Sequence, residues 1–265
     1  MEGEFEDLCD FLRRYKDQEV IYIPNPGNAG DSIIAYGTLL VFRDAGLRWT
    51  FGDINETYAG KTLFYAGGGN LGLYTNCITF LERNKDLNHI VVLPHTIIDA
   101  DDVLRGLGDN ITIICRERTS FEYVKSIKPR HVYLSKDFAF YIRDLDAYHN
   151  PSATSVLNSF RTDNEKTTIP IPEDNLDISY LISLKDAKNN TCNVDSIVKI
   201  TDCMFGCISK FGTVNTNRLH VAIAASLLGK RVHFYPNCYH KNRSVYEYSM
   251  RDRFPNTVFH DDENV

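Results

Sequence analysis

The chain has 265 residues, of which 43% are hydrophobic and 24% are charged, so it can bury one large α/β core or two smaller ones. Its formal net charge of -6 argues against a nucleic acid or an anionic membrane as partner, because either would require a basic face. No apolar run reaches transmembrane length, and the acidic start differs from a signal peptide. We therefore expect a globular, cytoplasmic protein with no integral membrane segment.

Short apolar runs alternate with helical patterns in the first half of the chain. Strands are predicted at 20–23, 62–66, 90–93, 111–115 and 132–134, with helices at 32–45 and 119–127. Near-continuous apolar strands are typical of a parallel sheet that helices cover on both faces. The pattern predicts a Rossmann-like, doubly wound first domain over residues 1–148.

The second half repeats this alternation on a smaller scale after an irregular polar stretch at 145–154. Strands are predicted at 156–160, 178–182, 211–214 and 232–235, helices at 194–204, 217–228 and 242–250, and a loop at 185–191. We expect a second, smaller Rossmann-like domain over residues 149–265.

The most informative segment is 216–220, Thr-Asn-Arg-Leu-His, where a strand is followed by a helix. If the helix begins near Asn217, Arg218 and His220 lie in its first turn, beside unpaired backbone N–H groups and the positive end of the helix dipole. Such a place can hold a phosphate or a carboxylate, and His220 adds an acid/base group. An isolated Arg-x-His is also compatible with a surface ion pair and a histidine that only caps the helix.

Polar and glycine-rich segments follow the carboxyl ends of several predicted strands, the edge where open α/β sheets bind ligands. The loop 24–32 is either a ligand loop or a tight turn, and the glycines at 67–69 allow close approach of a phosphate, a sugar or a neighbouring backbone, unless they form a linker. His95 is expected to close its strand, either as a site residue or as a hydrogen-bonded core histidine. The candidate contacts from these segments are Asn28, Asp31, Gly68, Gly69, Asn70, His95 and Arg116.

In the second half, Arg161 and Lys241 lie in polar segments that again follow predicted strands, and ordinary solvated loops are the alternative. The repeated placement favours a cleft between two sheets, in which Arg116 and Arg218 bind an anion. The histidines are dispersed and the cysteines show no paired spacing, so no metal site is predicted.

Taken in chain order, the segments 25–31, 67–70, 93–96, 116–117, 137–140 and 217–220 resemble the polysaccharide pyruvyl transferase family, and the similarity extends into 160–165 and 241–249. The resemblance implies two Rossmann-like domains arranged as in GT-B glycosyltransferases, with the Arg-Leu-His donor site in the second. It also implies a reaction in which phosphoenolpyruvate and a sugar of a glycan or glycoside give a pyruvate ketal and phosphate. Neither a cofactor nor a metal is expected.

The resemblance also implies roles for individual residues. His220 is expected to be the proton donor, His95 to assist the acceptor hydroxyl or the leaving phosphate, and Arg116 to stabilise charge. Arg218, with Leu219 and Asn217, is expected to bind the donor, and Asn217 stands where an acidic residue is common in the family. Alanine variants of Arg218 and His220 are expected to fold normally and lose most turnover.

Two other functions are compatible with the same architecture. One is a glycosyltransferase that uses a nucleotide sugar, which a nucleoside diphosphate would stabilise against heat while phosphoenolpyruvate would not. The other is a non-catalytic sugar-binding relative. The expected partners are phosphoenolpyruvate and a sugar or glycan acceptor, and the sequence does not specify the acceptor sugar.

Overall fold

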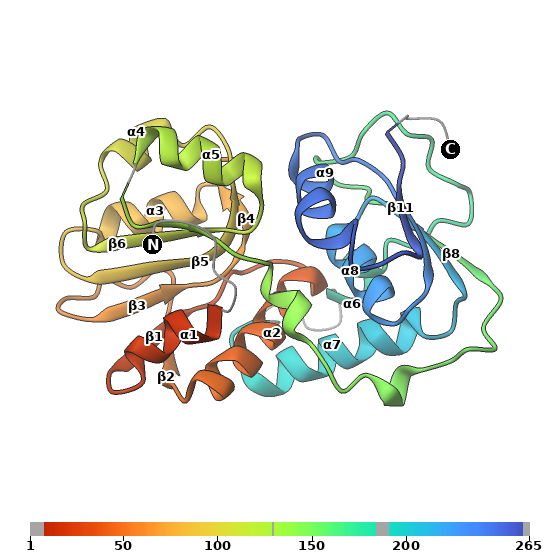
Figure 1. Cartoon of the computed structure of the whole chain (residues 1–265), viewed down its shortest axis with the longest axis horizontal. Helices are drawn as coiled ribbons and strands as arrows, with labels where there is room; N and C mark the ends of the chain where they lie inside the picture. Colours follow the sequence, from red (N-terminus) through yellow and green to blue (C-terminus); the bar gives the residue numbers. More distant parts are fainter. Residues whose placement is uncertain (1–7, 129, 184–190, 262–265) are drawn as a thin grey trace. The chain divides into compact units, whose positions relative to one another are not determined.

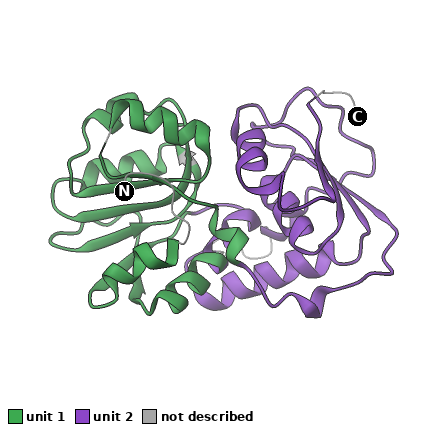
Figure 2. Ribbon diagram, in the orientation of Figure 1, with its two compact units in different colours: residues 1–25, 37–141 green, residues 26–36, 142–265 purple. Residues whose placement is uncertain are grey.

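The computed structural model describes residues 8–128, 130–183 and 191–261. The chain forms two compact units, unit 1 with Met1–Asn25 and Gly37–Tyr141, and unit 2 with Pro26–Tyr36 and Ile142–Val265 (Figure 2). Helix α2 (Ala29–Ala45) contributes its first two turns to unit 2 and its remaining turns to unit 1. The division of the chain into domains at 148/149 stays a prediction.

Unit 1 is built on a seven-stranded sheet in which every pairing between described strands is parallel. The order is β2-β1-β3-β5-β6-β7, and β4 also pairs with β5 (Figure 1). The strands are β1 (Glu19–Ile23), β2 (Arg48–Phe51), β3 (Thr62–Tyr65), β4 (Gly68–Leu71), β5 (His89–Ile97), β6 (Ile111–Cys115) and β7 (Val132–Leu134). The parallel α/β sheet expected from the apolar runs is therefore confirmed.

The central strands of unit 1 are buried along their length, as β6 shows with five buried residues in succession. Such strands need cover on both faces, and α5 packs against β5, β6 and β7. The helical segments of this unit besides α2 are α1 (Leu8–Leu12), α3 (Asn76–Asn84), α4 (Asp101–Arg105), α5 (Arg118–Ile127) and the 3-10 turns η1 (Arg13–Tyr15) and η2 (Phe138–Tyr141).

Strand β5 changes partner halfway along its length. Its first part pairs with β3, and its last part, from His95 onward, pairs with β4. The register with β6 shifts between Val92 and His95, on either side of Pro94, which has no N–H to donate to the ladder. His95 therefore lies inside the strand and does not close it, which corrects the expected strand end.

Unit 2 contains a four-stranded parallel sheet in the order β11-β10-β9-β8. Its strands are β8 (Val156–Ser159), β9 (Thr213–Thr216), β10 (Arg231–Phe234) and β11 (Thr257–Phe259). Helix α8 packs against β9 and β10 and buries seven of its nine residues. The other helical segments are α6 (Ile178–Ser183), α7 (Val194–Ile208), α9 (Lys241–Val245), the π-helical η5 (Tyr246–Met250) and the 3-10 turn η3 (Asp146–Tyr148).

Several expected elements differ from the structure. The run 178–182 forms helix α6 and not a strand, because Asp177 accepts the N–H groups of Tyr180 and Leu181 on its carbonyl oxygen and starts the turn. The glycine segment is no linker, because β4 begins at Gly68. Helix α8 begins at Leu219, two residues later than expected. The predicted loop 185–191 lies, except for Thr191, outside the described residues.

Among the described residues, no helix combines the length and the apolar character that crossing a membrane requires.

Candidate functional site

In unit 2, the expected anion-binding segment follows β9 directly. The Thr216 hydroxyl donates to the Ser159 carbonyl oxygen at 2.6 Å and accepts the Arg218 N–H at 2.9 Å, which fixes the turn between strand and helix. Arg218 is the N-cap of α8 with extended backbone angles, so it precedes the first turn and does not lie within it. His220 is in the first turn of α8 and is half-buried.

Two helix N-termini meet at His220 within unit 2. A side chain on Gly30 would place its Cβ 2.7 Å from His220 Nδ1, so the first turn of α2 lies directly against the imidazole. Only glycine permits this approach. Because each helix N-terminus carries partial positive charge, the surroundings of His220 favour an anion.

The loop before α2 forms a capping box. Asn28 Oδ1 accepts the Gly30 N–H at 2.8 Å, and Asp31 Oδ2 accepts the Asn28 N–H at 2.9 Å. A Cβ on Gly27 would lie 2.0 Å from the Asp31 carboxylate, so this glycine makes room for the cap. The Asn28 and Asp31 side chains thus hold the helix start beside His220, and their contact with substrate stays a prediction.

Arg218 is buried and forms ion pairs with two carboxylates. Its Nε and Nη2 lie 2.9 Å and 2.5 Å from the two oxygens of Asp177, and its Nη1 lies 2.7 Å from Asp163 Oδ2. Removing one partner of a buried ion pair costs roughly 3–5 kcal/mol. The expectation that Arg218→Ala folds normally therefore no longer holds, because the variant leaves Asp177 buried without its cation.

The segments at Arg161 and Lys241 are not ordinary solvated loops, since both side chains are buried. Arg161 forms ion pairs with Asp163 and Glu165, and Lys241 forms one with Glu165. Together with Arg218 and Asp177, these residues make a network of three cations and three carboxylates, which we call the unit 2 ion network. Its formal charges cancel.

Two carboxyl groups of this network, those of Glu165 and Asp163, are held in their ionised form. Burial by itself would raise the pKa of Glu165, but the charges of Lys241 and Arg161 lower it to about 2. Burial likewise opposes ionisation of Asp163, whereas the hydrogen bonds and charge of Arg161 and the charge of Arg218 hold its pKa well below the usual range.

Asn217 links the ion network to the neighbouring strand ends. Its Oδ1 accepts the Arg161 N–H at 2.8 Å, and its carbonyl oxygen accepts Asn242 Nδ2 at 2.7 Å. Leu219, the next apolar residue along the chain, is buried. The Asn217 side chain thus accepts one of these hydrogen bonds and its backbone accepts the other.

In unit 1, Arg116 follows β6 as expected and is almost fully buried. Its Nη1 donates to Asp137 Oδ2 at 2.8 Å and its Nε donates to Thr96 Oγ1 at 2.8 Å. Asp137 also accepts the Ala139 N–H, so it both starts the turn η2 and orients Arg116. The guanidinium is thereby fixed in place at the carboxyl end of the sheet.

His95 lies beside this pair and is fully buried. Burial, followed by the charge of Arg116, lowers the pKa of His95 to about 3, so the imidazole is neutral at physiological pH. A neutral imidazole can accept a proton or a hydrogen bond but is a poor proton donor. Of the two expected catalytic histidines, His95 is therefore the poorer proton donor, and the donor role of His220 stays a prediction.

Gly68 of β4 lies against the same residue. Gly68 pairs with His95 and has a φ of 154°, and a Cβ there would lie 2.8 Å from Asn25 Nδ2. Asn25 in turn donates to the Gly67 carbonyl oxygen at 2.8 Å. Gly68 thus serves close packing, and substrate contact by Gly68 and Gly69 stays a prediction. The side chain of Asn70 lies outside the described part of the chain.

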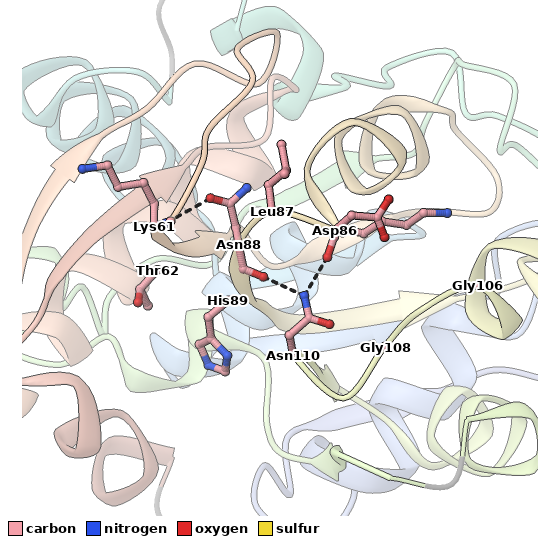
Figure 3. A pocket seen from close by; sticks show the side chains of 11 residues that line it. Lys61, Thr62, Asp86, Leu87, Asn88, His89, Gly106, Gly108 and Asn110 are labelled. Carbon is pink, nitrogen blue, oxygen red and sulfur yellow. Dashed lines mark hydrogen bonds between the residues drawn. The ribbon is translucent and has the colours of Figure 1, made fainter.

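Unit 1 also has a pocket of about 600 Å³, but at the opposite edge of its sheet (Figure 3). The amino-terminal ends of β3 and β5 and the turn before β6 line it. Asn88 Oδ1 accepts the Lys61 N–H at 3.1 Å, and Asn110 Nδ2 donates to the carbonyl oxygens of Lys85 and Asn88 at 2.6 Å and 2.7 Å. These amides connect the turns, and we assign them no role in the reaction.

The candidate residues thus form two sets, one in each unit. Unit 2 contains Asn28, Asp31, Arg161, Asn217, Arg218, Leu219, His220 and Lys241, and unit 1 contains Gly68, Gly69, Asn70, His95 and Arg116. In both units most of these residues follow the carboxyl end of a parallel strand or lie at the start of the next helix. The exceptions are the residues that lie within strands β4 and β5.

Comparison with known proteins assigns the class of this α/β protein. The sequence model of the family described as "Polysaccharide pyruvyl transferase" matches residues 28–239, so the chain belongs to this family. Pyruvyl transferase EpsO of Bacillus subtilis (strain 168) is 27% identical, over 91% of this chain and 88% of that protein. The crystal structure of the uncharacterized protein KP1_0663 of Klebsiella pneumoniae is 35% identical, covers 96% of this chain and 97% of that one, and has a TM-score of 0.84.

Sequence reasoning missed the carboxylates of the ion network. Asp163 and Glu165 were assigned to a polar strand end, and Asp177 carried no assignment. The alternation Arg-x-Asp-x-Glu at 161–165 is the one available signal, because it places acids at fixed distances from a cation. Asp177 gives no such signal, since it lies 41 residues before Arg218 in the chain.

Proposed function

We propose that this protein transfers the enolpyruvyl group of phosphoenolpyruvate onto a sugar of a polysaccharide, forming a pyruvate ketal and releasing phosphate. The observation that carries the proposal is the arrangement around His220 in a member of the polysaccharide pyruvyl transferase family. The imidazole lies in the first turn of α8 and against the first turn of α2. A donor with a phosphate and a carboxylate suits this positive environment.

The chemistry needs one proton on the methylene carbon of the donor. His220 supplies it as the general acid. A sugar hydroxyl then bonds to C2, the bond between C2 and the phosphate oxygen breaks, and a second hydroxyl closes the ketal. Of the two hydroxyl protons, one replaces the proton taken from His220 and the other leaves with phosphate.

Arg218 and Arg161 hold the negative charges of the donor, assisted by Lys241, which shares the same network. His95 assists the acceptor hydroxyl or the leaving phosphate as a neutral imidazole, and Arg116 stabilises developing charge. In this mechanism the protein requires no cofactor besides its donor. A GT-B-like arrangement of the two units, and a cytoplasmic location, belong to the same proposal.

The test is incubation with phosphoenolpyruvate and a panel of glycosides, with phosphate release and a mass increase on the sugar as readouts. We expect His220→Gln to fold normally and lose roughly a hundredfold or more in turnover, the usual contribution of a general acid. His149→Gln, at an exposed histidine of unit 2, is the matched control and should retain activity. Wild-type turnover by His220→Gln would refute the assigned role.

A further inference from the structure

Asp163 lies between the guanidinium groups of Arg161 and Arg218. Arg161 donates to its two oxygens through Nε at 2.7 Å and Nη2 at 3.0 Å, and Arg218 Nη1 is 2.7 Å from Oδ2. The Asp163 side chain is 41% exposed, whereas those of the two arginines are 5% and 6% exposed. Of these three side chains, Asp163 is therefore the one that solvent reaches most.

The other two carboxylates of the network are buried. Asp177, 5% exposed, accepts two parallel hydrogen bonds from Arg218, and its Oδ2 also accepts the Thr162 N–H at 3.3 Å. Glu165, 8% exposed, lies between Arg161 and Lys241. Bidentate and buried pairs of this kind fix the orientation of a guanidinium. The three acids thus differ in place: two anchor cations from the interior and one faces outward.

We propose that Asp163 is a resident counter-ion which occupies an anion site between Arg161 and Arg218, and that a phosphate or carboxylate group of the substrate replaces it there. Asp177 is the positioning residue that keeps Arg218 directed at this site. Carboxylate and phosphate offer a guanidinium the same fork of oxygens, so one can take the place of the other. The identity of the anion as the donor rests on the proposed function.

The charge balance predicts how Asp163 changes the affinity for the anion. With Asp163 in place, three cations face three carboxylates and the network is neutral. When Asp163 moves out, one positive charge remains for the incoming anion. Asp163 lies in the loop between β8 and α6, so its displacement breaks no strand or helix. The resident carboxylate therefore competes with the ligand and weakens its binding.

Binding of inorganic phosphate and of phosphoenolpyruvate, measured by isothermal titration calorimetry at low salt, tests this proposal. Asp163→Asn removes the charge and keeps the shape, so we expect it to bind phosphate roughly tenfold more tightly than wild type. Glu173→Gln, at an exposed carboxylate of the same loop, changes the net charge equally and should leave the affinity within about twofold. Equal or weaker phosphate binding by Asp163→Asn would overturn the proposal.

Asp177→Asn tests the positioning role. Asp177→Asn also removes one negative charge, but it removes the bidentate anchor of Arg218 as well. A folded Asp177→Asn protein should therefore bind phosphate more weakly than wild type, and unchanged or tighter binding would contradict the positioning role. Circular dichroism checks that the variant is folded. If it is not, the comparison of Asp163→Asn with wild type by itself tests the proposed anion site.

The assay with phosphoenolpyruvate and glycosides separates the two proposals. Tighter phosphate binding by Asp163→Asn without any ketal from the wild-type protein would support the counter-ion and reject pyruvyl transfer. Ketal formation by the wild type without tighter phosphate binding by Asp163→Asn would support pyruvyl transfer and reject the counter-ion.

Discussion

His95 shows how far the surroundings of one side chain decide its chemistry. As a residue it could be an acid, a base or a core histidine, and all three are compatible with its place in the sequence. In the structure it is fully buried in β5 next to Arg116, and burial, followed by the charge of Arg116, lowers its pKa to about 3. It is thus both a core histidine and a neutral candidate for hydrogen bonding to substrate.

The lowered pKa predicts a dependence of stability on pH. Between pH 6.5 and about 3 the unfolded chain binds a proton at His95 that the folded chain does not, so acidification lowers the free energy of unfolding. The contribution is about 1.4 kcal/mol for each pH unit below 6.5 and is absent above it. Urea unfolding at pH 7, 6 and 5 measures this contribution as the difference in the free energy of unfolding between wild type and His95→Asn.

We expect the stability gap, which is the difference in the free energy of unfolding between wild type and the variant, to narrow for His95→Asn as the pH falls from 7 to 5. The same experiment on His149→Gln, at an exposed histidine, provides the control, and its gap should stay nearly constant. A gap that is equally constant for both variants would show that His95 titrates normally in the folded protein.

Arg218 illustrates the opposite case among single residues, since its position after a strand was predictable but its partners were not. The pairing with Asp163 and Asp177 depends on how the loop 160–177 folds over the end of β9. A sequence reports which charges exist, and only the folded chain decides which of them neutralise one another.

At the scale of elements, the start of α2 is the best-defined feature near His220. Its capping box uses Asn28 and Asp31, and Gly27 and Gly30 supply the space for the box and for the imidazole. From the sequence alone, Asn28 and Asp31 were equally compatible with contact to a ligand. The hydrogen bonds show that holding the helix start is one role they have.

Loss of the cap predicts a defined change in stability. Asn28→Ala removes the acceptor for the Gly30 N–H and should lower the free energy of unfolding by about 1 kcal/mol. Asn193→Ala removes the equivalent N-cap of α7, where the side chain accepts the Ser196 N–H, and should cost a similar amount. Urea unfolding of both variants measures the two costs.

The two caps should differ in their effect on turnover. Asn28 holds the helix turn that contacts His220, so we expect Asn28→Ala to reduce ketal formation severalfold, whereas Asn193→Ala leaves it close to wild type. An equal loss in both variants would mean that the cap at Asn28 acts through stability alone.

Strand β5 shows an irregularity at the same scale. The apolar run predicted a strand there, and in the structure β5 changes partner from β3 to β4 and shifts its register with β6 around Pro94, which has no N–H to donate. The short strands β2, β4 and β11 were not predicted from the sequence.

At the scale of the whole molecule, the choice between donors separates pyruvyl transfer from nucleotide-sugar chemistry on the same α/β architecture. A ligand that binds only the folded state stabilises it by about 2.7 kcal/mol when present at a hundred times its dissociation constant. We therefore expect phosphoenolpyruvate to raise the melting temperature of the full chain and uridine diphosphate to leave it unchanged. Differential scanning fluorimetry measures both, with sulfate at matched ionic strength as the control.

A rise in melting temperature with uridine diphosphate but not with phosphoenolpyruvate would favour the glycosyltransferase alternative. An equal rise with phosphoenolpyruvate and sulfate would show only a general anion site.

The sequence by itself determined the parallel α/β class, most long strands and helices, the place of the Arg-Leu-His segment after a strand, and the family. The elements follow from apolar runs and caps, which are patterns within a few residues of one another, and the family follows from the order of the motifs along the chain. Only the tertiary structure decided that α6 is a helix, that the start of α2 lies against His220, and that Asp163, Glu165 and Asp177 neutralise three cations. The contact of Gly30 with His220 and the ion pairs of Arg218 and Lys241 join residues far apart in the chain, and their energies depend on burial, which arises only when the chain has folded.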